Sequence, residues 1–160
     1  MPNYRLLALS SSRRERMVGD GVCYFGYDVS SFEDTAIMHI DDYENVFGRK
    51  RSQASTWYKR LSVVRITYKD RTEQHSIYRK FRPSRNASMK DCVAVSYHSL
   101  LFLKDGDNNI AGRIVNVSRS NWVLFYWNHP NEVVQTSIAL GIISLFLGLI
   151  SFIVSIVSIL

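Results

Sequence analysis

Residues 138–160 read IALGIISLFLGLISFIVSIVSIL and contain no charged side chain; the last charge before them is Glu132. A helix of these 23 residues is roughly 35 Å long, enough to cross a hydrocarbon core of about 30 Å. We therefore expect residues 133–160 to form a single-pass transmembrane anchor. Because the anchor is C-terminal, we expect all other residues to lie on one side of the membrane, as in a tail-anchored protein.

Small and hydroxyl residues recur along this stretch with the spacing 4, 3, 4, 3, 4, 3, which is typical of a heptad seam. In lipid, helices associate through close backbone approach at small residues and through hydroxyl hydrogen bonds. The pattern predicts self-association of the span. The alternative is that each serine bonds a carbonyl of its own helix four residues earlier. The predicted packing seam consists of Ser137, Gly141, Ser144, Gly148, Ser151, Ser155 and Ser158.

The remaining 130 or so residues suffice for one domain with its own core. Residues 17–48 contain seven acidic residues and no lysine or arginine, whereas residues 49–90 contain thirteen basic and two acidic residues, a net charge of +11. We divide the chain into a basic N-terminal arm at 1–16, a soluble α+β domain at 17–130 with acidic (17–48) and basic (49–90) parts, and the anchor at 133–160.

Hydrophobic periodicity predicts the elements of this domain. A strand is expected at 23–29 and an amphipathic helix over 32–47, ended by Gly48. The second half of 57–68 and residues 74–81 read as a hairpin, and three further strands are expected at 92–103, 110–117 and 122–127, with turns at 105–109 and 118–121. The predicted fold class is α+β: a small, mostly antiparallel sheet domain with one amphipathic helix, followed by a single C-terminal transmembrane helix.

The last expected strand ends in aromatic residues a few positions before the span. Aromatic side chains at this place are typical of an interfacial belt at the membrane surface, and they equally suit a domain core. The predicted interfacial aromatics are Trp122, Tyr126 and Trp127.

No apolar stretch near the N-terminus is long enough for a signal peptide. We therefore expect the domain to be cytosolic and the tail to insert into an endomembrane derived from the endoplasmic reticulum. Two sequons, at Asn86 and Asn116, and two cysteines, Cys23 and Cys92, leave a luminal domain open, because a disulfide would suit that compartment.

The sequence contains no GxSxG, HExxH, P-loop or GxGxxG motif, and the cysteines match no zinc or CxxC spacing. We expect no catalytic residue, no metal site and no cofactor, hence no enzyme.

The acidic part can neutralise at most seven of the basic part's charges. We expect the excess to form a basic face that binds anionic lipid or a protein partner. Nucleic acid is a less favoured partner, suggested by aromatics interleaved with the charges. The predicted basic residues are Arg49, Lys50, Arg51, Lys59, Arg60, Arg79, Lys80, Arg82 and Arg85.

Together these patterns predict a membrane-tethered, non-enzymatic interaction or scaffold protein that forms a homo-oligomer through its span. One alternative is a small oligomeric ion channel of the viroporin kind. A second is a membrane anchor for a nucleic-acid-bound, virus-encoded assembly.

Overall fold

Two compact units make up the chain, Met1–Trp122 and Val123–Leu160. All described strands lie in the first unit, and the second contains the long C-terminal helix. The structure is a computed structural model that describes residues 2–10, 22–24, 34–53, 59, 62–70, 73–103 and 110–159.

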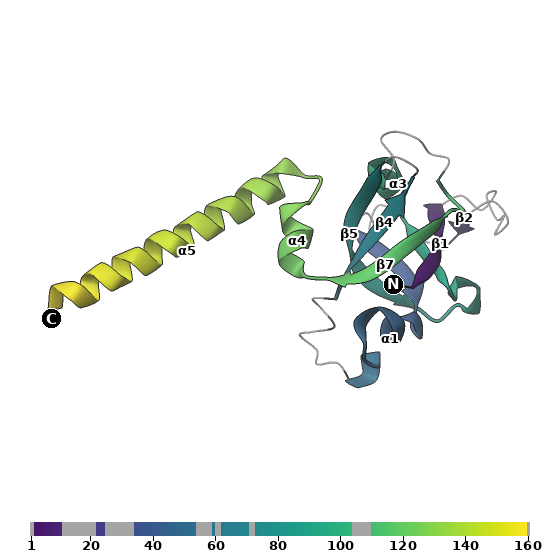
Figure 1. The fold of residues 1–160 in the computed structure, drawn as a ribbon, viewed down its shortest axis with the longest axis horizontal. Coiled ribbons are helices and arrows are strands. Elements are labelled where there is room, and N and C mark those ends of the chain that lie inside the picture. The colour runs from purple at the N-terminus through teal and green to yellow at the C-terminus, as the bar shows by residue number, and fades with distance from the viewer. Residues whose placement is uncertain are drawn as a thin grey trace. The chain divides into compact units, whose positions relative to one another are not determined.

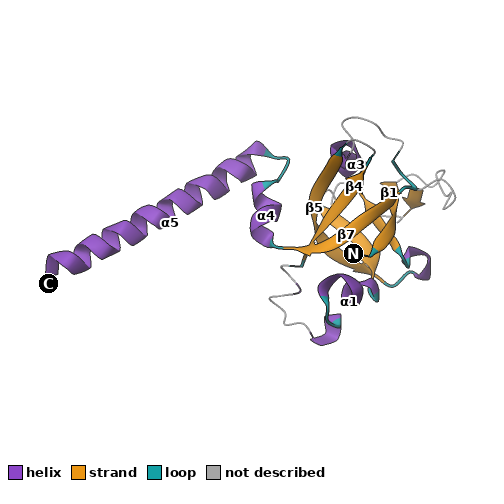
Figure 2. Cartoon of the chain, viewed as in Figure 1, coloured by secondary structure: helices purple, strands orange, loops and turns teal. Residues whose placement is uncertain are grey.

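Seven strands form one sheet in the order β2-β1-β6-β3-β5-β4-β7, and β1 also pairs with β7. This extra pairing closes six strands into a barrel (Figure 2). β2 lies outside the closed barrel and pairs with residues 8–10 of β1, whereas β7 pairs with residues 3–5. The strands are β1 Asn3–Ser10, β2 Val22–Tyr24, β3 Thr35–His39, β4 Val63–Lys69, β5 Gln74–Ser84, β6 Cys92–Val95 and β7 Ile114–Ser120.

The barrel is mixed, which corrects the expectation of a mostly antiparallel sheet. β1 is parallel to β2 and β6, and β3 is parallel to β5. The other pairs, β1–β7, β3–β6, β4–β5 and β4–β7, are antiparallel. The N-terminal arm supplies β1, which lies between β6 and β7 in the barrel wall. Strand partners so distant in sequence leave no local signal from which the pairing could be predicted.

Side chains at alternate positions of the strands fill the barrel interior. Tyr4 and Leu6 of β1 point into the main core, whereas Leu7 and Leu9 belong to a second cluster. A strand buried on both faces has a continuous apolar run instead of an alternating one. The second cluster also contains Ile37 of β3, Met89 of η4 (Ala87–Met89) and Ala94 of β6, so the β1–β6–β3 wall is buried on both sides.

Short helices lie at opposite ends of the barrel (Figure 1). In α1 (Asp42–Phe47), Tyr43 and Phe47 stack with ring centroids 4.4 Å apart, and both rings meet the edge of Phe81 of β5. In α3 (Tyr97–Leu103), Leu100 and Leu103 are buried in the same core. Each helix thus covers one end of the barrel with apolar side chains.

The predicted amphipathic helix over 32–47 is wrong in its first half. β3 occupies Thr35–His39, and only Asp42–Phe47 is helical. Three successive residues of β3 are buried because both faces of the strand are covered: Ala36 and Met38 lie in the main core and Ile37 in the second cluster. The apolar pattern of this strand therefore does not alternate. The predicted stop is confirmed: Gly48 has φ 71° and its N–H bonds the Glu44 carbonyl at 2.8 Å.

Three predicted strands also need correction, while the hairpin is confirmed by the β4–β5 pairing from Lys69↔Gln74 to Val63↔Lys80. The expected strand 92–103 is β6 followed by α3, and the break falls at Ser96, whose Oγ accepts from the Ser99 N–H at 3.3 Å. The expected strand 110–117 is β7, which begins only at Ile114 and continues to Ser120, into the expected turn at 118–121. Residues 122–127 are the helix α4 (Trp122–Trp127). The expected turn at 105–109 lies outside the described residues, as does most of the strand expected at 23–29 beyond β2.

Candidate functional site

The longest element is α5 (Glu132–Ile159), a helix of 28 residues. Its stretch Glu132–Ser158 is long and apolar enough to cross a membrane, and none of its most apolar window is buried within the chain. A soluble domain rarely leaves so large a contiguous apolar surface uncovered. The helix is consistent with a single C-terminal membrane span.

All seven residues of the predicted packing seam lie on α5 with exposed side chains or, for the glycines, exposed backbone. A Cβ added at Gly141 or Gly148 would meet nothing within 4 Å, so the helix surface is open there. The structure therefore places the small residues where a second helix could approach closely.

The serine hydroxyls of the seam fall into two groups. Those of Ser137, Ser155 and Ser158 donate to the carbonyl four residues earlier, at 2.7–2.9 Å. Such bonds satisfy a hydroxyl in lipid without a partner helix. The hydroxyls of Ser144 and Ser151, which flank Gly148, make no hydrogen bond within the described part of the chain. The two serines next to Gly148 thus differ in hydrogen bonding from the serines nearer the ends of the seam.

The predicted interfacial aromatics are on a helix, not on a strand. Trp122 and Trp127 are 45% and 56% exposed, and Tyr126 is half-buried. The Phe125 ring, at the centre of α4, lies 5.0 Å from the ring of Tyr126 and 5.5 Å from that of His129.

The predicted basic residues do not share one environment. Arg49, Lys50, Arg82 and Arg85 are exposed, Lys59 and Lys80 are half-buried, and Arg79 is buried. The side chain of Arg51 and all of Arg60 lie outside the described residues. Exposed basic side chains also occur elsewhere on the barrel unit, so the positive charge is spread over more than one segment; these are Arg5, Lys69, Lys90, Arg113 and Arg119.

Arg79 cannot contribute to a basic face, because it points into the barrel and is 3% exposed. Its Nε donates to Ser99 Oγ at 2.8 Å and its Nη1 to the Tyr78 carbonyl at 2.7 Å. Ser99 Oγ in turn lies 2.9 Å from Ser96 Oγ. Burial lowers the pKa of Arg79, while Asp34 opposes this shift. The guanidinium therefore links β5 to α3 from inside the barrel.

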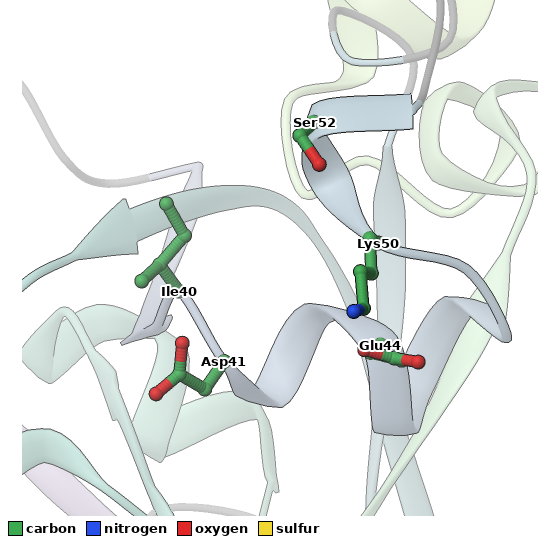
Figure 3. Close-up of a pocket in the computed structure, with 5 residues that line it drawn as sticks. All are labelled: Ile40, Asp41, Glu44, Lys50 and Ser52. Atoms are coloured by element: carbon green, nitrogen blue, oxygen red, sulfur yellow. The ribbon is translucent and has the colours of Figure 1, made fainter.

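Lys50 lies beside acidic side chains. It lines a pocket of about 340 Å³ together with Ile40, Asp41, Glu44 and Ser52. Figure 3 shows its ammonium group directed toward Glu44. This pocket therefore carries both signs of charge, with residues of the acidic and basic parts lining it together.

Sequence patterns gave no indication of a buried acidic group at one end of the barrel. Asp42 is 1% exposed, and its Oδ2 has no hydrogen-bond partner within the described residues. Burial raises the pKa of Asp42, nearby Asp91 raises it further, and a hydrogen bond from the Asp91 backbone N–H lowers it. Asp91 has φ 57°, a left-handed conformation. Burial, reinforced by Asp42, raises the pKa of Tyr4 to about 12.

The strand order separates the two cysteines. Cys23 in β2 pairs with Leu9 on one edge of β1, and Cys92 in β6 pairs with Arg5 on the other. Two strand spacings are about 9.6 Å, whereas the Cα atoms of a disulfide lie within about 7 Å. Cys92 is a free cysteine, so a bond between these cysteines no longer supports a luminal domain.

No group of three or more metal-ligating side chains occurs within the described ranges. No protein-family model, curated protein or solved structure matches the chain.

Proposed function

We propose that the protein is a membrane-anchored scaffold whose barrel is held at a membrane by α5. The observation that carries the proposal is the exposure of the apolar stretch Glu132–Ser158, none of whose most apolar window is buried, in a chain whose barrel has its own filled core. Lipid is the environment that covers such a helix without a protein partner. Because apolar side chains occupy the barrel interior, partners meet its outer wall and its ends.

The scaffold assembles by pairing of α5 helices at the centre of the seam. Support comes from the open surface at Gly148. One turn to either side of it, the hydroxyls of Ser144 and Ser151 have no hydrogen-bond partner among the described residues. In lipid, a hydroxyl that hydrogen-bonds to a neighbouring helix favours association, and so does a glycine that lets the backbone of that helix approach closely.

The test is Förster transfer between donor- and acceptor-labelled full chains in phosphatidylcholine vesicles at increasing lipid-to-protein ratio. We expect transfer for the wild type and an about tenfold weaker association for Gly148→Ile, corresponding to ~1.4 kcal/mol. Leu149→Ile, which is off the seam and keeps the volume of the side chain, serves as the matched control. If Gly148→Ile associates as well as the wild type, the seam is not the interface.

The exposed basic residues Arg49, Arg82 and Arg85 add a contact to anionic lipid. Each basic side chain near an anionic membrane surface contributes about 1 kcal/mol, and salt screens this attraction. The rotational mobility of the barrel on vesicles should therefore fall when phosphatidylserine is added and recover at high salt. In the double variant Arg82→Gln/Arg85→Gln, both the fall in mobility and its recovery should be smaller.

An oligomeric channel is the second candidate. It is favoured by the exposed hydroxyls of Ser144 and Ser151, which bond no other residue that the structure describes. Ion flux from vesicles containing the wild type, abolished by Ser144→Leu, would select the channel over the scaffold. Absence of flux from vesicles in which α5 associates would select the scaffold.

A further inference from the structure

Large apolar side chains are exposed on α4 as well as on α5. Val123, Leu124 and Trp127 are 40%, 41% and 56% exposed. Val123 and Trp127 are four residues apart and Leu124 and Trp127 are three apart, so all three lie on one side of the helix. This apolar face of α4, defined as Val123, Leu124 and Trp127, comes before the polar residues that connect it to the predicted span.

The connection between α4 and α5 is held by its own hydrogen bonds. The backbone N–H and the Nδ2 of Asn128 both donate to the Leu124 carbonyl, at 3.1 and 2.9 Å. Asn131 Oδ1 accepts from the Val133 N–H at 2.9 Å, which caps α5. Gln135 Nε2 reaches back across the turn to the His129 carbonyl at 2.7 Å. A turn bonded in this way keeps α4 next to the first turns of α5.

The first turns of α5 set the depth of α4 relative to the hydrocarbon core of the bilayer. If the hydrocarbon core begins near Ile138, Gln135 and Thr136 lie about 3–5 Å outside it at ~1.5 Å per residue. Trp127 lines a pocket of about 340 Å³ with Gln135, Thr136 and Ala139. With that boundary, the indole lies at the level of the lipid headgroups and glycerol esters, where tryptophan is enriched in membrane proteins.

We propose that α4 lies in the interfacial layer of the bilayer that α5 crosses, with its apolar face immersed and phospholipid glycerol-ester groups filling the pocket beside Trp127. The inference rests on the proposed membrane span and adds a second, surface-lying contact. Continuity of the two exposed apolar surfaces through a hydrogen-bonded turn supports lipid as the partner. The consequence is that α4 is fixed at the bilayer surface.

Depth-dependent quenching of Trp127 fluorescence tests the proposal. The full chain carrying Trp57→Phe and Trp122→Phe retains Trp127 as its single tryptophan. It is placed in phosphatidylcholine vesicles brominated at a shallow or a deep acyl position, and flotation after an alkaline wash measures anchoring independently. A depth control carries Leu149→Trp with all three native tryptophans replaced by phenylalanine.

We expect the protein to float, Trp127 to be quenched at least twofold more by shallow than by deep bromine, and Leu149→Trp to show the opposite order. A protein that floats but whose Trp127 is unquenched and open to aqueous acrylamide overturns the interfacial position while leaving the span intact. Trp127 unquenched but shielded from acrylamide, increasingly so at higher protein-to-lipid ratio, overturns it in favour of a second copy. Failure of both flotation and Leu149→Trp quenching overturns the proposed span and this inference together.

Discussion

Replacement of Asp42 by asparagine should stabilise the barrel at neutral pH. The carboxyl group is buried, Oδ2 has no hydrogen-bond partner within the described residues, and Asp91 lies close enough to raise its pKa further. Burial of a charged group costs more than burial of a neutral polar group, for which an unmade hydrogen bond alone costs about 1–3 kcal/mol. Asp42→Asn removes the charge and keeps an oxygen that can accept from the Asp91 N–H. We expect a gain of about 1–2 kcal/mol in the free energy of unfolding at pH 7.5.

The sign of the pH dependence follows from the direction of the shift. Because the folded pKa of Asp42 lies above its unfolded value of 3.8, the folded state binds the proton more tightly. Stability from this group is present below the unfolded pKa and is lost as pH rises through the folded pKa. The advantage of Asp42→Asn should therefore be largest at pH 7.5 and should shrink toward pH 4.

Urea unfolding of the full chain in detergent micelles, followed by tryptophan fluorescence at pH 4 and 7.5, measures both effects. Asp41→Asn is the matched control, because the neighbouring Asp41 side chain is 73% exposed and its replacement should change stability little. A loss of stability in Asp42→Asn at pH 7.5, or an equal gain at both pH values, would refute the assignment of a destabilising buried carboxyl group.

Two further predictions concern the barrel unit. Gly48→Ala should lower the free energy of unfolding by about 1 kcal/mol, because Gly48 has φ 71° while an added Cβ meets no atom within 4 Å, so only backbone strain is introduced. An unchanged urea midpoint in this variant would contradict the strain. Cys92 should react with iodoacetamide at pH 8 at least tenfold more slowly than glutathione does. The reason is that burial raises the pKa of its thiol, which outweighs the lowering by Arg5. Mass spectrometry of a Cys23→Ser variant measures this rate, and a rate equal to that of glutathione would contradict the burial.

Sequence patterns predicted those elements whose signal is local. The uncharged run 138–160 indicated α5, Gly48 ended α1, and the alternation around the turn after Lys69 indicated the β4–β5 hairpin. Each of these depends on neighbouring residues alone. The overall class, α+β with a long apolar C-terminal helix, follows from the same signals.

The barrel itself depends on contacts between distant parts of the chain. β1, β3 and β6 are flanked on both edges and buried on both faces, so their apolar runs lack the alternation that separates strand from helix. Similarly, residues 122–127 are rich in aromatic and branched side chains and read as a strand, yet they form α4. Arg79 shows that the candidate site is subject to the same difficulty. Its charge predicted an exposed position, and only the pairing of β5 within the barrel shows that its side chain lies inside.

The central claim, that α5 crosses a membrane and leaves the barrel on the cytosolic side, is tested most directly by insertion of the full chain into endoplasmic reticulum microsomes after translation. A short acceptor sequon appended after Leu160 reports the C-terminus, and the exposed sequon at Asn86 reports the barrel. We predict that the appended sequon is glycosylated, that Asn86 is not, and that the chain resists alkaline extraction. An unglycosylated chain that alkali extracts, or a chain glycosylated at Asn86, would contradict the account.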